Sequence, residues 1–188
     1  MTPDSIRKSA VLRAPLARAW AAVSDARRFG SWFGVEFDGA FEKGRELTGR
    51  IVPTTVDPEV AKLQEPHRGK PFAFSVDRVE PIRRISFRWH PFAIDPKVDY
   101  SKEPMTLIEF ALEEVEGGTR LTITESGFEA IPLARREQAY RANRADGSTS
   151  CGWWGSTWKT DPHRGPLPGE REPTRTCAAR HSPRGSSR

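Results

Sequence analysis

Glu125 is the residue whose type and position point most directly to chemistry. It follows Leu121 and Ile123 at every second position of the segment TRLTITES, residues 119–126. Alternate residues of a strand face the same side of a sheet, so Glu125 is predicted to point inward with these apolar neighbours. A carboxylate in that position must find a hydrogen-bond donor or raise its pKa. Three interpretations of Glu125 remain: a polar anchor in a ligand cavity, an ion-pair partner of an arginine, or a turn cap ahead of Gly127.

The remaining polar residues form no recognisable catalytic or metal-binding motif. His90 alternates with arginine and serine in the segment RISFRWH, residues 84–90, and is therefore predicted to be exposed. His67 lies in a proline-rich loop, and the spacing of the two histidines fits no metal site. Asp95, Asp99 and Glu103 are interpreted as a solvated acidic rim. The sequence contains no G-x-S-x-G motif and no glycine-rich phosphate loop, so no catalytic residue, metal or cofactor is predicted.

Strands account for most of the elements that must position Glu125. Residues 5–14 are predicted to form a first strand, and Pro15 suits the first turn of a following helix. Ser24 and Asp25 are predicted to stop that helix and to cap a second one, over residues 26–33. Six further strand candidates alternate with period two: 35–39, 46–52, 72–80, 84–90, 106–115 and 119–126. The Glu-Gly-Gly run at residues 116–118 predicts a hairpin between the last two strands.

Loops and one helix complete the predicted order. The proline-rich segments 53–71 and 91–104 are predicted to be loops. Residues 133–143 are predicted to open a C-terminal helix. The expected class is α+β: one curved antiparallel sheet of about seven strands, with two short helices after the first strand and a long helix at the end.

Charge and composition separate the chain into two regions. Of its 30 basic and 25 acidic side chains, eight basic and four acidic ones lie in residues 144–188. Residues 1–143 are thus almost neutral, and nothing in them indicates a nucleic-acid partner. No apolar run is long enough to span a membrane and no signal peptide is evident, so a cytoplasmic protein without a membrane partner is expected. Both cysteines lie in residues 144–188, and no pattern predicts an oligomeric state.

Several short motifs resemble the START/Bet v 1-like superfamily, and within it the SRPBCC proteins similar to the activator of heat-shock protein 90 ATPase. The resembling segments are Ala14-Pro15 with Ala19-Trp20, RFGSWF at 28–33, VEP at 79–81, FRWHP at 87–91, TLIEF at 106–110, GGTRLT at 117–122 and ESGF at 125–128. The resemblance covers about residues 5–143 and implies a helix-grip fold. It also implies a cavity between the sheet and a long C-terminal helix, which commonly encloses apolar ligands.

The C-terminal region departs from this resemblance. The resemblance implies a glycine-tryptophan pair and a long amphipathic helix, but residues 144–188 hold CGWWGSTWK and then proline-, arginine- and serine-rich sequence. Back-translation of residues 151–160, read from the third base of each codon, gives apolar and charged residues at helical spacing. We therefore predict a domain at 1–143, with a truncated last helix, and a disordered tail at 144–188 that is a frameshift product. The alternative is a natural disordered extension.

Two functions of different classes follow from the resemblance, with a third behind them. The first is the binding of a small hydrophobic or aromatic ligand between sheet and helix, without catalytic machinery. The second is a chaperone-associated interaction domain that docks through its convex sheet surface. The third is a polyketide-cyclase-like enzyme. The predicted pocket residues are Trp32, Phe33, Phe74, Phe87, Trp89, Phe110, Ile123 and Glu125. For each aromatic residue among them, simple core packing is the competing interpretation.

Overall fold

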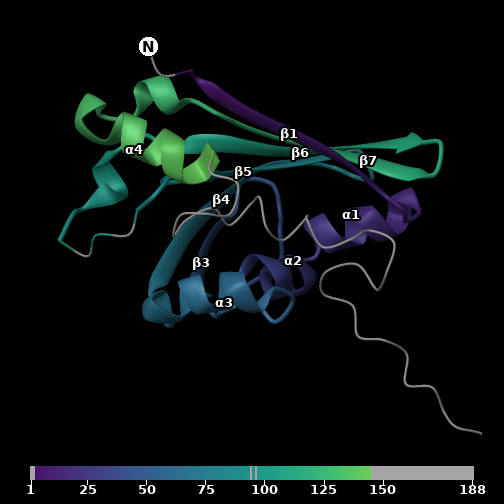
Figure 1. Cartoon of the computed structure of the whole chain (residues 1–188), viewed down its shortest axis with the longest axis horizontal. Helices are drawn as coiled ribbons and strands as arrows, with labels where there is room; N and C mark the ends of the chain where they lie inside the picture. Colours follow the sequence, from purple (N-terminus) through teal and green to yellow (C-terminus); the bar gives the residue numbers. More distant parts are fainter. Residues whose placement is uncertain (1–2, 94, 96, 145–188) are drawn as a thin grey trace, which may run out of the picture.

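Seven antiparallel strands form one sheet in the computed structural model, which describes residues 3–93, 95 and 97–144 (Figure 1). The strands are β1 (Ser5–Leu12), β2 (Val35–Phe37), β3 (Glu46–Ile51), β4 (Pro71–Glu80), β5 (Arg84–Trp89), β6 (Thr106–Val115) and β7 (Gly118–Ser126). Their order across the sheet is β1-β7-β6-β5-β4-β3-β2. Strands that follow one another in the sequence therefore lie side by side, except that β1 pairs with β7 and not with β2. The predicted α+β helix-grip class is confirmed.

Two short helices follow β1, as predicted. They are α1 (Leu16–Ser24) and α2 (Ala26–Phe33). The Asp25 side chain caps α2 by accepting a hydrogen bond from the backbone N–H of Arg28 at 2.8 Å. Trp32 Nε1 donates to the carbonyl oxygen of Ala22 at 3.0 Å, which links the two helices through a buried indole. Gly34 ends α2 with φ of 89°, a left-handed conformation that glycine adopts without a steric penalty.

The predicted loop at 53–71 contains a helix, α3 (Pro58–Gln64), followed by a 3-10 turn at Glu65–His67. The prediction of a loop was wrong because proline suits the first turn of a helix as well as a loop, and Pro58 occupies that turn. Asp57 caps this helix by accepting from the N–H groups of Glu59 at 2.9 Å and Val60 at 3.1 Å. The loop predicted at 91–104 likewise contains a 3-10 turn, Tyr100–Lys102.

The side chain of Gln64, the last residue of α3, connects that helix to the end of α2 by hydrogen bonds. Its side chain is fully buried, its Oε1 accepts from Thr54 N–H at 2.8 Å and its Nε2 donates to the Phe33 carbonyl at 2.9 Å. A side-chain amide satisfies both of these buried backbone groups, which would otherwise lack partners. α3 is therefore held by polar contacts as well as by apolar packing.

The helix α4 (Leu133–Arg144) follows a 3-10 turn at Phe128–Ala130 and packs beside β1. Ile6, Phe128 and Tyr140 form a small apolar cluster there, separate from the main core. α4 lies near one end of the sheet, and α1 and α2 lie toward the other end (Figure 1). The predicted tail and frameshift at 144–188 lie outside the described residues apart from Arg144.

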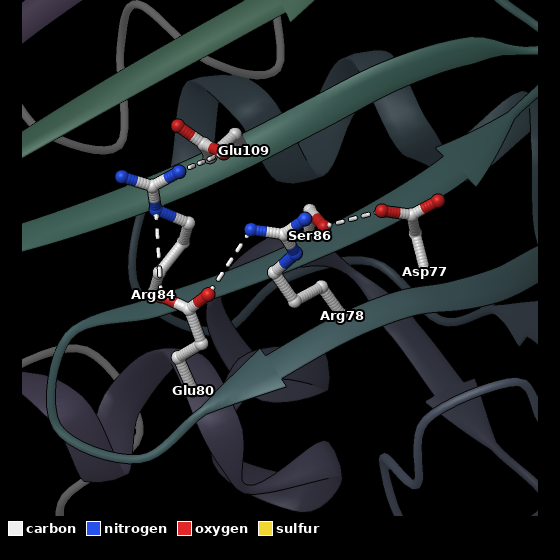
Figure 2. A network of polar contacts seen from close by, with 6 residues as sticks. All are labelled: Asp77, Arg78, Glu80, Arg84, Ser86 and Glu109. Atoms are coloured by element: carbon white, nitrogen blue, oxygen red, sulfur yellow. Dashed lines mark hydrogen bonds and ion pairs between the residues drawn. The ribbon is translucent and has the colours of Figure 1, made fainter.

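The β6–β7 hairpin at Glu116–Gly118 is confirmed, with Gly117 at φ of 84°. Charged side chains of β4, β5 and β6 form a network of polar contacts on one face of the sheet (Figure 2). Arg84 binds Glu109 across β5 and β6 at 3.2 Å, and Arg78 binds Glu80 at 3.0 Å. A register shift between Val76 and Arg78 marks an irregularity in the pairing of β4 with β5. Positive and negative charges alternate on this face and compensate each other.

Candidate functional site

The concave side of the sheet carries a buried aromatic cluster. Phe74, Phe87 and Phe110 come from β4, β5 and β6, and each has at most 2% of its surface exposed. Phe29 of α2 lies over all three, with ring centroids 6.1, 5.5 and 5.6 Å away. Rings at these separations and tilts stabilise one another beyond their area burial. These three predicted pocket residues therefore pack against one another and against α2 as part of the main core.

All six aromatic residues among the predicted site residues belong to this one core cluster. Trp32 belongs with the core group, since its ring lies over Phe29 at 4.6 Å and its N–H is used within the helix pair. Phe33 and Trp89 belong to the core cluster as well, with the Phe33 ring centroid 5.0 Å from that of Phe29, and Trp89 also contacts Glu125. The rings of Phe33 and Trp89 stack at 5.4 Å with an interplanar angle of 17°. The eighth candidate, Ile123, is only partly buried and packs against the core.

Glu125 is the one polar residue among the predicted site residues, and it is buried, with 4% of its surface exposed. Its Oε1 accepts from Trp89 Nε1 at 3.0 Å, Thr106 Oγ1 at 2.7 Å and Asn143 Nδ2 at 2.9 Å. Asn143 Nδ2 also lies 3.0 Å from Oε2. The three donors come from β5, β6 and α4. The carboxyl group of Glu125, on β7, thus joins strands β5 and β6 to the last helix.

The partners of Glu125 bear on one of the interpretations offered for it, the ion pair with an arginine. Among the described residues its hydrogen-bond partners are an indole, a hydroxyl and an amide, and none is an arginine. Burial raises the pKa of Glu125 above its ordinary value, against the opposing effect of these hydrogen bonds and of the Lys8 charge. An inward-facing acid with a raised pKa retains its proton at pH values where an exposed glutamate loses it. The group therefore offers a hydrogen-bonding carboxyl and not an ion pair.

A second polar cluster joins α4 to the segment between β5 and β6. The Arg135 guanidinium binds Glu103 at 2.5–2.6 Å and donates to the Pro91 carbonyl at 2.9 Å, and both charged side chains are only 15% exposed. The guanidinium also lies 4.8 Å from the ring centroid of Tyr100. Glu103 was predicted as part of a solvated rim, and that prediction was wrong because Arg135, 32 residues away, covers it.

His90 is a second correction. It was predicted to be exposed by strand alternation, but β5 ends at Trp89 and alternation no longer applies at the next residue. The ring is half-buried, and its Nδ1 has no hydrogen-bond partner among the described residues. Burial lowers the pKa of His90, while the Glu103 charge raises it and the Arg135 charge lowers it. The histidine therefore belongs to the wall formed by this second cluster.

The sequence prediction missed Thr106, Asn143 and Arg135. Thr106 precedes Ile108 and Phe110 at period two, so the same alternation that indicated Glu125 places Thr106 on the concave face. Asn143 follows Tyr140 by three residues, a spacing that places both on one face of α4. No local pattern indicates that Arg135 binds Glu103.

The described part of the chain shows neither a metal-binding cluster nor a membrane-spanning helix. No group of three histidine, cysteine, aspartate or glutamate side chains there is arranged to hold a metal ion. None of the described helices has the length and apolar character needed to cross a bilayer.

Solved structures of the same fold come from several bacteria. The solution structure of a protein from Arthrobacter aurescens superposes with a TM-score of 0.52 at 19% identity, over 72% of this chain and 73% of that one. Crystal structures of proteins from Mycobacterium smegmatis and Mesorhizobium loti each give a TM-score of 0.51 at 18% identity. They cover 80% and 74% of this chain, and 88% and 85% of their own chains. At these identities the likeness shows the fold alone.

Comparison of the amino-acid sequence, unlike the comparison of structures, identifies the family of this chain. No curated protein gives a significant match. Residues 13–153 match the family described as "Activator of Hsp90 ATPase homolog 1-like protein". The match extends past the domain boundary predicted at residue 143, and its last residues lie outside the described part of the chain. It covers well over half of the sequence, and the chain belongs to the family of activator of Hsp90 ATPase homolog 1-like proteins.

Proposed function

We propose that this domain binds a small hydrophobic or aromatic ligand between the concave face of the sheet and α4, with Glu125 as its polar anchor. The observation that carries the proposal is the Glu125 cluster. A carboxyl group buried in an apolar face lowers stability unless its partners offset the desolvation cost, and an apolar residue of similar size would avoid that cost. Perturbed ionisable groups of this kind are concentrated at functional sites.

The surroundings of Glu125 fit a ligand that is mostly apolar. On the neighbouring strands Ile6 and Ile108 stand in register with it, and both are buried. The Trp89 ring, stacked on Phe33, adds a flat aromatic surface beside the carboxyl. Sites for small molecules commonly combine apolar walls with a few polar groups that fix orientation. Trp89, Thr106 and Asn143 do not titrate near neutral pH, so the cluster provides a fixed hydrogen-bonding group and not an acid/base pair.

Native mass spectrometry of the full chain, purified without denaturant, tests this proposal. We expect a bound mass that is released on denaturation and lost in Glu125→Leu. Glu113→Leu is the matched control, because Glu113 lies on the neighbouring strand β6 in an exposed pair with Arg120. It should retain the bound mass. A wild-type chain that binds no added apolar molecule, or an adduct that survives Glu125→Leu unchanged, contradicts the proposal.

A second candidate is a chaperone-associated interaction domain, which the family's description favours. The surface for it is the convex face of β4, β5 and β6, where Arg84 and Glu109 lie on adjacent strands (Figure 2). This candidate predicts that the chain changes the ATPase rate of Hsp90 and that Arg84→Glu abolishes the change. An unaltered ATPase rate with saturating wild-type chain eliminates it.

A further inference from the structure

The strand β1 forms one edge of the sheet, and no further strand lies beside it among the described residues (Figure 1). It pairs with β7 over its whole length of eight residues, from Ser5 to Leu12. The helix α4 covers the beginning of this edge, where Tyr140 packs with Ile6 and donates to the Ser5 carbonyl at 3.5 Å. An edge strand presents a row of backbone N–H and C=O groups to which a further strand can bond.

The β6–β7 hairpin determines which backbone groups of β1 point to the outer side of the edge. Val115 and Gly118 close its two-residue turn as a hydrogen-bonded pair, so the N–H and C=O of Gly118 point to β6. Those of the next residue, Thr119, then point to β1, and the direction alternates along β7 without a register shift. Leu12, in register with Thr119, therefore bonds to β7, and the backbone groups of Val11 point outward.

The same alternation leaves Arg7, Ser9 and Val11 with their backbone N–H and C=O groups on the outer side. The contact from α4 agrees with this assignment, because the Tyr140 hydroxyl reaches the Ser5 carbonyl from outside the sheet. Nothing in the described part of the chain bonds the backbone of Arg7, Ser9 or Val11 on that side. These groups are therefore available to a further antiparallel strand, and their spacing matches its hydrogen-bonding pattern.

The side chains along this edge are basic. Residues 5–18 contain no acid, and their cations are Arg7, Lys8, Arg13 and Arg18. Arg7 and Arg13 are exposed, and neither forms an ion pair with another described residue. The acid of the neighbouring strand β7 is Glu125, which is buried on the concave face. Two copies joined at this edge would bring two basic strands together without a countercharge, whereas an acidic strand supplies one.

We propose that β1 is a docking edge for an extended acidic segment of another protein, which adds a strand to the sheet. Backbone hydrogen bonds to Arg7, Ser9 and Val11 provide the affinity, as in other cases of strand addition. The exposed side chains of these residues set the preferred sequence. It has an acid opposite Arg7, a hydroxyl opposite Ser9 and an apolar residue opposite Val11, which is 44% exposed. In antiparallel addition the partner therefore reads apolar-x-hydroxyl-x-acid from its N-terminal end.

A fluorescein-labelled peptide with the core Ile-Thr-Thr-Glu-Glu, titrated with the full chain, tests the proposal by fluorescence anisotropy. In antiparallel register its isoleucine stands opposite Val11 and its last glutamate opposite Arg7. We expect saturable binding that weakens as salt is added, because exposed charges are screened. The same peptide with Lys-Lys in place of Glu-Glu should bind at least about tenfold more weakly, since it places like charges against the edge.

N-methylated peptides distinguish strand addition from a general attraction between charges. The second threonine of the core stands opposite Ser9, so its N–H points to β1. The first threonine stands opposite Ala10, whose backbone groups bond to β7, and the N–H of this threonine points away from β1. Methylation of the second threonine should weaken binding about tenfold, the effect of one lost hydrogen bond. Methylation of the first should have little effect.

Variants of the chain test the same hydrogen bonds from the other side. Ser9→Pro removes the outward N–H, and proline is tolerated on an edge strand where that N–H faces solvent. It should bind the acidic peptide about tenfold more weakly than Ser9→Ala, the matched control, which also lacks the hydroxyl contact to the Leu121 carbonyl. Arg7→Glu should bind more weakly than Arg50→Glu, whose exposed arginine lies on β3, away from this edge.

The outcomes also separate an acidic partner from a second copy of this chain. Sedimentation velocity of the wild type, Ser9→Pro and Ser9→Ala should give the same sedimentation coefficient. A dimer that dissociates in Ser9→Pro and persists in Ser9→Ala assigns the edge to self-pairing and overturns the proposal. A wild-type chain that binds no acidic peptide, or binds the acidic and basic peptides equally, also overturns it. So does an equal effect of the two methylations, which do not depend on the folding of any variant.

Discussion

Replacing Gln64 with leucine tests whether the α2–α3 junction depends on one buried amide. Leucine has a similar volume, but it leaves the Thr54 N–H and the Phe33 carbonyl, now bound at 2.8 and 2.9 Å, without partners. A buried polar group without a partner costs about 1–3 kcal/mol, so the two together should lower the free energy of unfolding by about 2–6 kcal/mol. This is a large part of the 5–15 kcal/mol typical of a domain.

Urea unfolding followed by tryptophan fluorescence measures the loss. The matched control is Lys62→Leu, which introduces the same side chain at an exposed position of the same helix, and it should change stability by no more than about 0.5 kcal/mol. Hydrogen exchange adds a local readout, because the Thr54 amide should exchange faster in Gln64→Leu. A loss no larger than that of the control, or a destabilised variant whose Thr54 amide stays protected, would refute the reasoning.

Three further predictions concern the other buried contacts. Because the pKa of Glu125 is raised in the folded state, the folded protein holds the Glu125 proton to higher pH than the unfolded chain does. The contribution of this group to the free energy of unfolding is therefore fully present below the unfolded pKa near 4.5 and is lost as pH rises through the folded value. The stability of the wild type minus that of Glu125→Gln should therefore fall with pH, by at most about 1.4 kcal/mol per pH unit, and a difference that is flat or rises with pH contradicts it. Gly34→Ala should cost about 1–3 kcal/mol in urea unfolding, because φ is 89° and an added Cβ would lie 2.4 Å from the Gln64 amide; an unchanged midpoint would count against that contact. Arg135→Met breaks a partly buried ion pair and should cost about 3 kcal/mol, whereas Arg141→Met, in an exposed pair, should be nearly neutral, and equal losses would show that burial is not the cause.

Alternation was sufficient to predict most of the sheet. Ile85, Phe87 and Trp89 are all buried on one face, as a period of two requires. The alternation rule failed at His90, because β5 ends at Trp89 and the rule holds only within regular strand geometry. The helix α3 was missed because the sequence around Pro58 suits both a loop and a first helical turn, and only the Asp57 cap distinguishes them.

The candidate site could be predicted only in part. The inward orientation of Glu125 follows from its own strand, but its partners come from residues 18 to 36 positions away. Which donor meets the carboxyl depends on how β5, β6 and α4 pack, and no local pattern contains that information. The same holds for the Arg135 pair with Glu103. The aromatic candidates all lie in the main core, and whether one of them also lines a ligand site depends on packing that strand alternation does not describe.

The central claim, that a ligand binds at Glu125, is tested most directly by the two buried indole N–H signals. Trp89 Nε1 donates to Glu125 at 3.0 Å, and Trp32 Nε1 donates at the same distance to the Ala22 carbonyl in the helix pair. Both are assigned in ¹⁵N spectra by substitution with phenylalanine. On titration with a small aromatic molecule such as 2-ethylnaphthalene, the Trp89 signal should shift in a saturable manner while the Trp32 signal stays in place. A saturating titration that leaves Trp89 unmoved, or moves only Trp32, would contradict the account.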